Sequence, residues 1–329
     1  MTADPTVRTM SRPRRALQEI VTYACMAPSV HNTQPWSWHV DGDSIALHSD
    51  TRRQLAHADP SGRDLAISCG AALHHAQVAA GALGWTATVD RLPEGEDSTL
   101  LAVIGLTAAA PAPDAIDLLQ SIRDRHTDRR RFTSWPVPKE RLDHLAEVAA
   151  EWGADAVVVH EPGKRVRTEL LVGRAFDRQA ADPGVAEEQK GWVNRSARDG
   201  VPDVVIPADL PTETHRRTRF GGGLLTEPDR ELEATDGLLL LRGGSDDVLA
   251  WLRTGEGLSA LWLQATAGGL SVVPLSQAIE VEETRERLRS DVLHGLGAPH
   301  MLVRVGWQAI GRGLLPRTPR RPLEDVLTW

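Results

Sequence analysis

Cysteine is scarce in this chain of 329 residues, which argues against a scaffold held by disulfides. Cys25 and Cys69 lie in apolar helical contexts and form no CxxC pair, so we expect both to be reduced and buried. Residues 1–15 carry charges but lack the apolar core of a secretory signal. No apolar run approaches the roughly 18 residues of a membrane span. The sequence therefore predicts a cytoplasmic protein without a membrane span.

Positive charge does not dominate the chain, because the net charge is −8 and only three residues are lysine. Nucleic-acid binding needs a basic surface, so nucleic acid is not an expected partner. The basic residues are nearly all arginine, whose planar guanidinium binds phosphate through two parallel hydrogen bonds. With 41% hydrophobic and 25% charged residues, we expect a globular protein with a sizeable core.

Several familiar catalytic patterns are also missing. The twelve histidines include no HExxH, and His74 and His75 occupy adjacent, divergent helix positions, so no metal site is expected. No GxGxxG follows a predicted strand, and the glycines at 221–223 precede no helix, so a Rossmann site is not supported. GxSxG is absent, which leaves no hydrolase nucleophile elbow.

Residues 27–36, which read APSVHNTQPW, are the most unusual stretch that is present. They connect a predicted helix to a predicted strand. Pro28 and Pro35 restrict the backbone, so we expect a rigid loop. The polar side chains of this loop suit recognition of the edge of a flat, polar-rimmed ring, although a solvated connector is the simpler interpretation of any one of them.

A second unusual stretch, residues 123–132, reads RDRHTDRRRF. Clustered arginines favour an anion such as a phosphate monoester, because each guanidinium gives charge-assisted hydrogen bonds. The alternative is a solvated helix end in which Asp124 and Asp128 pair with neighbouring arginines. The local sequence leaves both interpretations open.

Periodicity and turn residues predict an α+β protein with helices and strands throughout the chain. Helices are expected at 14–26, 64–83, from 116 onward, 139–150, 165–179, 255–268 and 282–294. Strands are expected at 36–40, 44–49, 85–91, 100–107, 155–160, 237–242, 271–274 and 301–307. Residues 108–118 are expected to form a linker. Residues 182–235 are interrupted by glycine and proline, so we expect an irregular segment that acts as a lid.

The two halves of the chain can be aligned without a gap around their central helices. Gly70 falls on Gly255, and Gly84 falls on Gly269. Both helices are rich in small residues, which permit close helix packing. The first half alone carries the 27–36 loop, whereas the second half alone carries the arginine cluster. We therefore divide the chain into an arm at 1–13, a first repeat at 14–110 and a second repeat at 111–329 that contains the segment 182–235.

These motifs together resemble those of the FMN-dependent nitroreductase family. Residues 27–36 resemble its APSxxNxQPW motif, and Arg125-His-Thr127-Asp-Arg129 resembles its RxSxR motif, with threonine in the serine position and one extra residue before Phe132. The arrangement is most similar to the Acg-type branch, in which two half-repeats form one chain. The resemblance implies a nitroreductase-like fold and an intrachain pseudo-dimer with mixed sheets flanked by helices.

The resemblance also implies a cofactor and its binding residues. It implies one FMN per chain, with the phosphate on one half and the ring on the other. The implied phosphate ligands are Arg125, Thr127, Arg129 and Arg320 or Arg321. The implied ring ligands are Ser29 and Asn32 at the pyrimidine edge, with Gln34 in the same motif. The turn 274–277 stands where the family faces the N5 edge of the flavin, with Ser276 and Gln277 in place of Glu-Gly.

The implied activity is transfer of hydride from NAD(P)H to FMN and then to a nitroaromatic, quinone or similar conjugated acceptor. Such chemistry needs no protein nucleophile or acid–base pair, because the flavin takes up the hydride. The chain would act as a monomer, with a small-molecule electron acceptor as its partner. The alternative is an FMN-storage protein whose lid stays closed and which has little NAD(P)H reductase activity. The sequence does not identify the acceptor.

Overall fold

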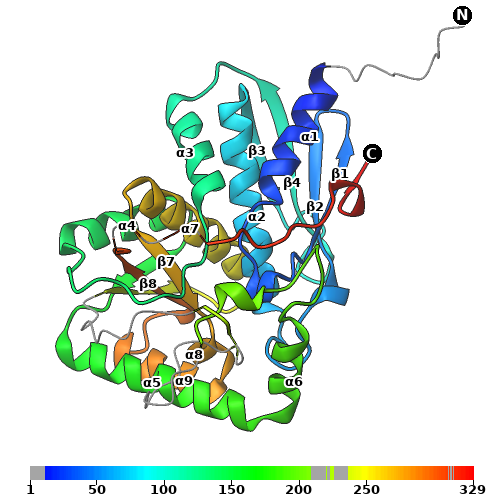
Figure 1. Ribbon diagram of the computed structural model, residues 1–329. Helices are drawn as coiled ribbons and strands as arrows, with labels where there is room; N and C mark the ends of the chain where they lie inside the picture. The colour runs from blue at the N-terminus through cyan, green and yellow to red at the C-terminus, as the bar shows by residue number, and fades with distance from the viewer. Residues whose placement is uncertain are drawn as a thin grey trace, which may run out of the picture.

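The computed structural model describes residues 12–208, 220, 223–225, 236–309, 311, 313 and 315–329. Residues 1–11 of the predicted arm and much of the predicted lid at 182–235 lie outside these residues. The arm prediction was two residues too long, because α1 already begins at Arg12. Within them the chain forms two sheets with helices between and around them (Figure 1).

The first sheet contains five strands in the order β3-β4-β2-β1-β9. These are β1 (Trp36–Asp41), β2 (Ser44–Ser49), β3 (Trp85–Arg91), β4 (Leu100–Ala108) and β9 (Leu327–Thr328). Strands β1 to β4 pair antiparallel, whereas β9 pairs parallel to β1, so the sheet is mixed. Buried and more exposed side chains alternate along β1, as expected for a sheet with helices on one face only.

The second sheet contains four antiparallel strands in the order β5-β6-β8-β7. These are β5 (Asp155–Val158), β6 (Gly237–Gly243), β7 (Ser271–Leu275) and β8 (Ala298–Gly306). Both faces of this sheet are covered. Leu239 and Leu241 of β6 belong to one hydrophobic cluster, and Leu238 and Leu240 belong to another. The unbroken apolar run at the start of β6 follows from burial on both faces.

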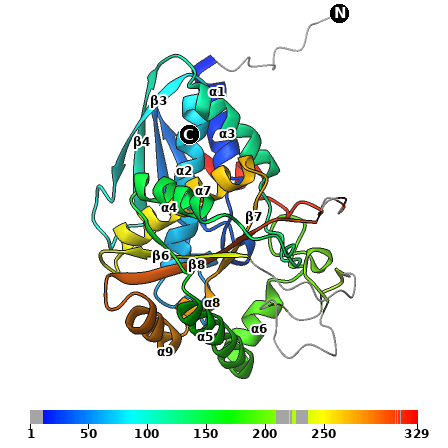
Figure 2. The same ribbon diagram turned by 90° about the vertical axis from the view of Figure 1, so that its left-hand side faces the viewer.

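The described helices cover these sheets and fill the space between them. They are α1 (Arg12–Ala24), α2 (Arg63–Ala82), α3 (Pro113–Asp124), α4 (Lys139–Glu151), α5 (Pro162–Ala181), α6 (Pro183–Gly191), α7 (Val248–Ala267), α8 (Gln277–Glu280) and α9 (Glu282–Arg287). A π-helical turn, Leu288–Val292, follows α9. Helix α2 packs on the first sheet and α7 on the second, and the two helices meet in the middle of the molecule (Figure 2).

The crossing of α2 and α7 is reciprocal. A Cβ atom added to Gly70 would lie 2.0 Å from the carbonyl oxygen of Leu252, and one added to Gly255 would lie 2.0 Å from that of Ile67. Gly70 and Gly255 are the residues that the sequence alignment superimposes, and each meets the residue three positions before the other. Such a self-complementary contact is typical of an interface with two-fold symmetry.

Several sequence predictions of element boundaries were wrong. Residues 182–235 are not irregular throughout, because Pro183 begins α6 and Asp182 caps it by accepting hydrogen bonds from the backbone of Gly184 and Val185. Proline is suited to the first turn of a helix, where its missing N–H would have no partner. Likewise α3 begins at Pro113 inside the predicted linker. Helix α7 begins seven residues before the predicted Gly255, where Asp247 caps it.

The C-terminal tail returns to the first sheet, which the sequence did not predict. Figure 1 shows the tail in red running beside β1. Strand β9 pairs with Trp38 and His39 of β1, and Val326 and Leu327 join the core of the first sheet. The tail therefore brings residues 315–321 close to the loop that precedes β1.

The two cysteines are buried and free, as predicted. Burial raises the pKa of the Cys25 thiol to about 12, and it raises that of Cys69 still further. The Cys69 thiol donates a hydrogen bond to the carbonyl oxygen of Pro35 at 3.2 Å. Both thiols therefore stay protonated near neutral pH, and both cysteines pack in the hydrophobic core of the first sheet.

Candidate functional site

The loop before β1 has an unusual backbone. His31, Asn32 and Gln34 adopt positive φ angles of 48°, 56° and 50°, a region that residues other than glycine seldom occupy. The Ser29 hydroxyl accepts a hydrogen bond from the backbone of Gln34 at 2.9 Å, which holds the loop closed. Such conformations persist only where the surroundings enforce them, and they concentrate at functional sites. The prediction of a rigid loop is consistent with this geometry.

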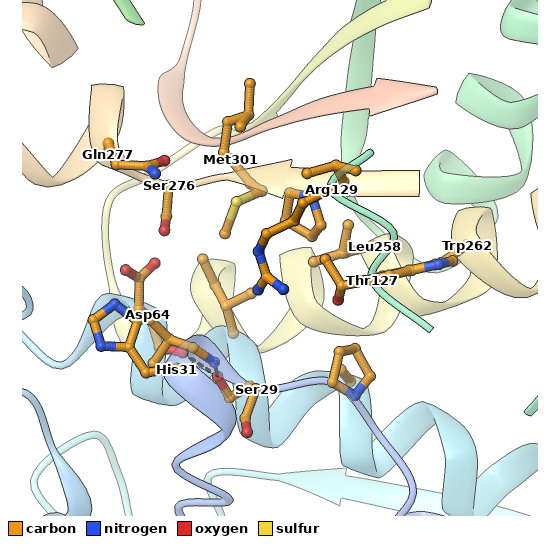
Figure 3. Close-up of a pocket in the computed structure, with 18 of the residues that line it drawn as sticks. Ser29, His31, Asp64, Thr127, Arg129, Leu258, Trp262, Ser276, Gln277 and Met301 are labelled. Carbon is orange, nitrogen blue, oxygen red and sulfur yellow. Dashed lines mark hydrogen bonds between the residues drawn. The ribbon is translucent and has the colours of Figure 1, made fainter. Parts of the chain in front are cut away.

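One cavity lies between this loop, α2, α7 and the β7–α8 turn (Figure 3). We call it the Trp262 cavity. Its described lining comprises Pro28, Ser29, Val30, His31, Asp64, Ile67, Ser68, Ala71, Thr127, Arg129, Phe220, Leu258, Trp262, Val273, Pro274, Leu275, Ser276, Gln277 and Met301. Apolar side chains and one indole ring form much of the wall, and polar groups stand at its edges. This combination suits a flat aromatic ligand with a polar rim.

A second cavity adjoins the first and shares Pro28, Ser29, Thr127 and Arg129 with it. We call it the arginine cavity. Its remaining lining comprises Met26, Asn32, Ile122, Arg123, Arg125, His126, Val201, Val205, Leu315, Pro316, Arg317, Thr318 and Arg320. The arginine cluster and the C-terminal tail, which are almost two hundred residues apart in sequence, therefore face the same space.

Arg125 and Arg320 are cations without a counter-ion among the described residues. No carboxylate of the described chain forms an ion pair with either one, and the Nε atoms of both are buried without a hydrogen-bond partner. Burial lowers the pKa of Arg125 to about 9 and that of Arg320 to about 10. The guanidinium of Arg125 also lies 4.7 Å above the ring of Trp262. Buried charge without a partner is costly, so this arrangement favours an anionic ligand in the cavity.

Local pairing accounts for only part of the arginine cluster. Arg130 forms an ion pair with Asp128 at 2.6 Å. Although burial opposes it, hydrogen bonds from His126 and Arg130 hold the pKa of Asp128 below its ordinary value. Asp124 accepts hydrogen bonds from Gln120 and not from an arginine. The solvated-helix interpretation therefore fits Arg130 but does not fit Arg125.

Asn32 lies in the arginine cavity and holds the tail. Its amide group donates to the carbonyl oxygens of Gly200 at 2.9 Å and Pro319 at 3.0 Å, and its oxygen accepts from Arg320 at 3.1 Å. The carboxamide is thus engaged within the protein, and Asn32 does not line the Trp262 cavity. Only Ser29, of the two residues predicted at the ring edge, lines that cavity.

Gln34 and Arg321 line neither cavity. The side-chain oxygen of Gln34 accepts from the backbone of Arg321 at 2.8 Å. The guanidinium of Arg321 donates to the carbonyl oxygens of Gln34 and Trp36. These two residues fasten the tail to the loop and so position Arg320, the neighbour of Arg321.

Ser276 and Gln277 line the Trp262 cavity on the wall opposite the loop (Figure 3). Gln277 is 4% exposed, and its side-chain oxygen has no hydrogen-bond partner within the described chain. A buried amide oxygen without a partner needs a donor from a ligand or from water. Thr127 and Arg129 stand at the boundary of the two cavities, where one ligand could meet both.

Several lining residues were not predicted from the sequence. His31 and Asp64 carry titratable groups, and Leu258, Trp262 and Met301 supply apolar surface. Asp64 lies in the first turn of α2, where an acidic residue is common for helix stability alone. Trp262 lies on α7, which is hydrophobic nearly all round. The sequence pattern therefore does not indicate which side of this helix faces a cavity. His31 was part of the recognised loop, and its burial was the missing information.

A polar cluster lies on the other side of the helix crossing, at the position that corresponds to the wall of the Trp262 cavity. A shift of 185 positions relates α2 to α7 and places Ala71 on Glu256 and Trp262 on Gln77. Glu256 is fully buried and accepts hydrogen bonds from Gln77 at 2.8 Å and from Arg91 at 2.6 and 2.8 Å. A polar cluster thus occupies the place of the cavity wall.

The segment around α6 forms another wall of the arginine cavity through Val201 and Val205. It is docked on the first half of the chain. The Glu188 carboxylate accepts from the backbone of Ala58 at 2.9 Å, and Arg53 forms an ion pair with Asp199. Among the residues described, no helix is long and apolar enough to cross a membrane, and no cluster of three metal-binding side chains occurs.

Asp59 precedes α2 and accepts a backbone hydrogen bond from the first turn of that helix. Its carboxylate accepts a hydrogen bond from the backbone of Leu65 at 2.9 Å, and burial raises its pKa to about 6. A raised pKa means that the folded chain binds a proton more tightly than the unfolded chain, so stability falls as pH rises from about 4 to about 6. We expect Asp59→Asn, which keeps the acceptor oxygen, to be up to about 3 kcal/mol more stable than the parent at pH 7.5.

Urea unfolding of both proteins at pH 4 and pH 7.5 checks this prediction. The other titrating groups are the same in both proteins, so their effects cancel in the difference between the two free energies of unfolding. A difference that is the same at both pH values would show that Asp59 does not carry the predicted penalty.

No family model matches the chain, but comparison with individual proteins is informative. Rv3131 of Mycobacterium tuberculosis, which is named among the NAD(P)H nitroreductases, is 39% identical over 316 residues, which cover 95% of this chain and 91% of that protein. The protein named acg from the same organism is 31% identical over 330 residues, with 94% coverage of each chain. PigM of Serratia, also named among the NAD(P)H nitroreductases, is 24% identical and covers 95% of this chain and 93% of its own.

Solved structures give weaker matches over part of the chain. The FMN-dependent nitroreductase NfnB from Mycobacterium smegmatis in complex with NADPH is 16% identical, with a TM-score of 0.44, and the match covers 65% of this chain and 98% of that one. A nitroreductase with bound FMN from Bacteroides fragilis is 16% identical, with a TM-score of 0.40, over 62% of this chain and 94% of that one. On the strength of the full-length relatives, the chain belongs to the nitroreductase family, in the branch that includes acg.

Proposed function

We propose that the chain binds one FMN and works as an NAD(P)H-dependent oxidoreductase on conjugated small molecules. The observation that carries this proposal is the pair of buried, uncompensated arginines beside an apolar cavity. An FMN has a phosphate at one end and a flat, polar-rimmed ring at the other, and the two adjoining cavities match these ends. The names of the full-length relatives support the use of NAD(P)H.

Arg125, Arg320 and Thr127 would bind the phosphate, and Arg129 would stand between the phosphate and the ring. Each charged hydrogen bond of this kind contributes roughly 1.5–3 kcal/mol. Ser29, Ser276 and Gln277 would meet the polar rim of the ring, and Trp262 and Leu258 would contact its faces or edge. Bound FMN would supply hydride transfer, and the chain would position the ring and limit the access of water.

The fused-repeat organisation is part of the same proposal. The division into 14–110 and 111–329 is supported by the reciprocal contact of Gly70 and Gly255. Because the hydrogen-bonded side chains of Glu256 and Gln77 stand at the counterpart position, the chain would bind one FMN and not two. The tail is an exception to the linear division, since β9 belongs to the first sheet. A monomer would then supply both halves of the site.

The test of this proposal is a spectroscopic titration of the purified chain with FMN. We expect a yellow complex with one FMN per chain, whose flavin absorption is bleached by NADH or NADPH without oxygen. Failure to take up FMN would refute the proposal, and two FMN per chain would refute the role given to the Glu256 cluster. A complex that neither nucleotide bleaches would support the alternative of FMN storage.

A further inference from the structure

Two residue types that line the Trp262 cavity, a carboxylic acid and an imidazole, serve as proton donors in enzymes that work near neutral pH. Among its described lining residues these are Asp64 and His31. Arg129 is also charged, but a guanidinium keeps its protons throughout this range. A reaction in this cavity that needs a proton therefore has only two obvious protein donors within the described chain.

Asp64 is the better placed of the two. It is 3% exposed and lies in the first turn of α2, and Figure 3 shows its carboxylate pointing into the space between the loop and Ser276. Its backbone oxygen accepts from the Ser68 hydroxyl at 2.6 Å, and that hydroxyl accepts from the backbone of Val30 at 3.1 Å. The Ser68 hydroxyl thus joins the loop to the first turn of α2, which carries Asp64. The ring of His31 lies beside it, 5.0 Å from the ring of Phe220.

The chemistry of the acceptor decides whether such an acid is useful. When a nitro group or a quinone is reduced, the protons go to oxygen or nitrogen, which exchange quickly with water. When an α,β-unsaturated carbonyl compound is reduced, one proton must go to carbon, which is slow without a positioned acid. The apolar side chains of Ile67, Leu258 and Met301 line this cavity, so an acid on its wall is better placed than bulk water to supply that proton.

We propose that Asp64 is the proton donor for reduction of an α,β-unsaturated carbonyl substrate in the Trp262 cavity. This inference rests on the proposed function, which supplies the hydride. The β-carbon of the substrate accepts the hydride, and its α-carbon accepts the proton of the Asp64 carboxyl group. The carbon–carbon double bond becomes a single bond, and Asp64 is left as a carboxylate that regains a proton from solvent. Asp64 thus selects a substrate class within the broad range of conjugated acceptors.

The deciding experiment follows oxidation of the reduced FMN complex by two acceptors in a stopped-flow instrument. Dithionite reduces the flavin, so the experiment does not depend on NAD(P)H. 2-Cyclohexenone needs a proton on carbon, whereas ferricyanide accepts only electrons. We expect Asp64→Asn to slow oxidation by cyclohexenone by about 100-fold or more relative to ferricyanide, as loss of a general acid does. The exposed Asp117→Asn on α3 is the matched control, and its ratio should equal that of the parent.

A second readout uses the protein without cofactor. The infrared difference between the parent and Asp64→Asn should contain, at pH 6, the carbonyl band of a protonated carboxyl group, with a shift in D₂O. His31 and Arg129 are the titratable and charged groups that face Asp64 in the cavity, so His31→Gln is measured alongside. Carboxylate bands alone would overturn the proposal.

The remaining outcomes are also decisive. The proposal is overturned if Asp64→Asn keeps the cyclohexenone rate within threefold, if His31→Gln alone causes the loss, or if cyclohexenone does not oxidise the parent complex. These results would leave the binding of FMN and its bleaching by NAD(P)H intact. A chain that fails to bind FMN, or that binds it without bleaching, would instead contradict the proposed function and would be recognised before any acceptor is added.

Discussion

Arg125→Met is expected to lower the affinity for FMN by about 100-fold, which corresponds to roughly 3 kcal/mol. The free energy of unfolding of the cofactor-free protein should stay unchanged or rise. The reason is that the charge of Arg125 is buried next to Arg320 without a carboxylate, as its lowered pKa reflects. Methionine keeps most of the volume and removes that cost. A purely structural arginine would behave in the opposite way and lose stability on substitution.

Arg141 offers the matched control. It also lies over a tryptophan, 5.2 Å from the ring of Trp307, and donates to a carbonyl oxygen, that of Gly268. It lines neither the Trp262 cavity nor the arginine cavity. We expect Arg141→Met to keep the FMN affinity and to lose at most about 1 kcal/mol of stability. Fluorescence titration with FMN and urea unfolding measure the two quantities. Equal FMN affinity in Arg125→Met and the parent would remove the phosphate assignment.

Gly255→Ala is expected to destabilise the protein by about 3 kcal/mol or more, although it adds a single methyl group. The new Cβ atom would lie 2.0 Å from the carbonyl oxygen of Ile67 and 2.8 Å from the Cα atom of Gly70. Both neighbours are helix backbone and cannot rotate away. Helices α2 and α7 would have to separate along the interface on which both sheets are built. Since both helices line the Trp262 cavity, FMN affinity should fall as well.

The control for this change is Gly173→Ala on α5, where an added Cβ atom has no neighbour within 4 Å. In an open helical position, alanine is favoured over glycine by about 0.5–1 kcal/mol, so this variant should be slightly more stable than the parent. Thermal and urea unfolding compare the two. A Gly255→Ala protein within 1 kcal/mol of the parent would show that the helices separate at little cost.

Local patterns predicted the regular elements well. The strand predictions at 44–49 and 85–91 coincide with β2 and β3, because alternation between turn residues is a property of the strand itself. The prolines that begin α3 and α6 were wrongly taken to indicate irregular structure. Proline occurs both in loops and in the first turn of a helix, and only the residues that follow decide between the two. The start of α7 was missed because its cap, Asp247, follows another aspartate in a polar turn.

The sequence by itself determined the two motifs, their order and the small residues of the central helices. These are local or periodic features, and they sufficed for the family. The single site assembled from two half-repeats stays a prediction. Only the tertiary structure decided which side chains line the two cavities. It placed Arg125 without a counter-ion and Arg130 with one, although the two are five positions apart. In the tertiary structure Asn32 forms hydrogen bonds with the C-terminal tail, and the side chain of Asp64 points into the Trp262 cavity. The physical reason is that burial and pairing depend on partners far away in sequence, which no local pattern records.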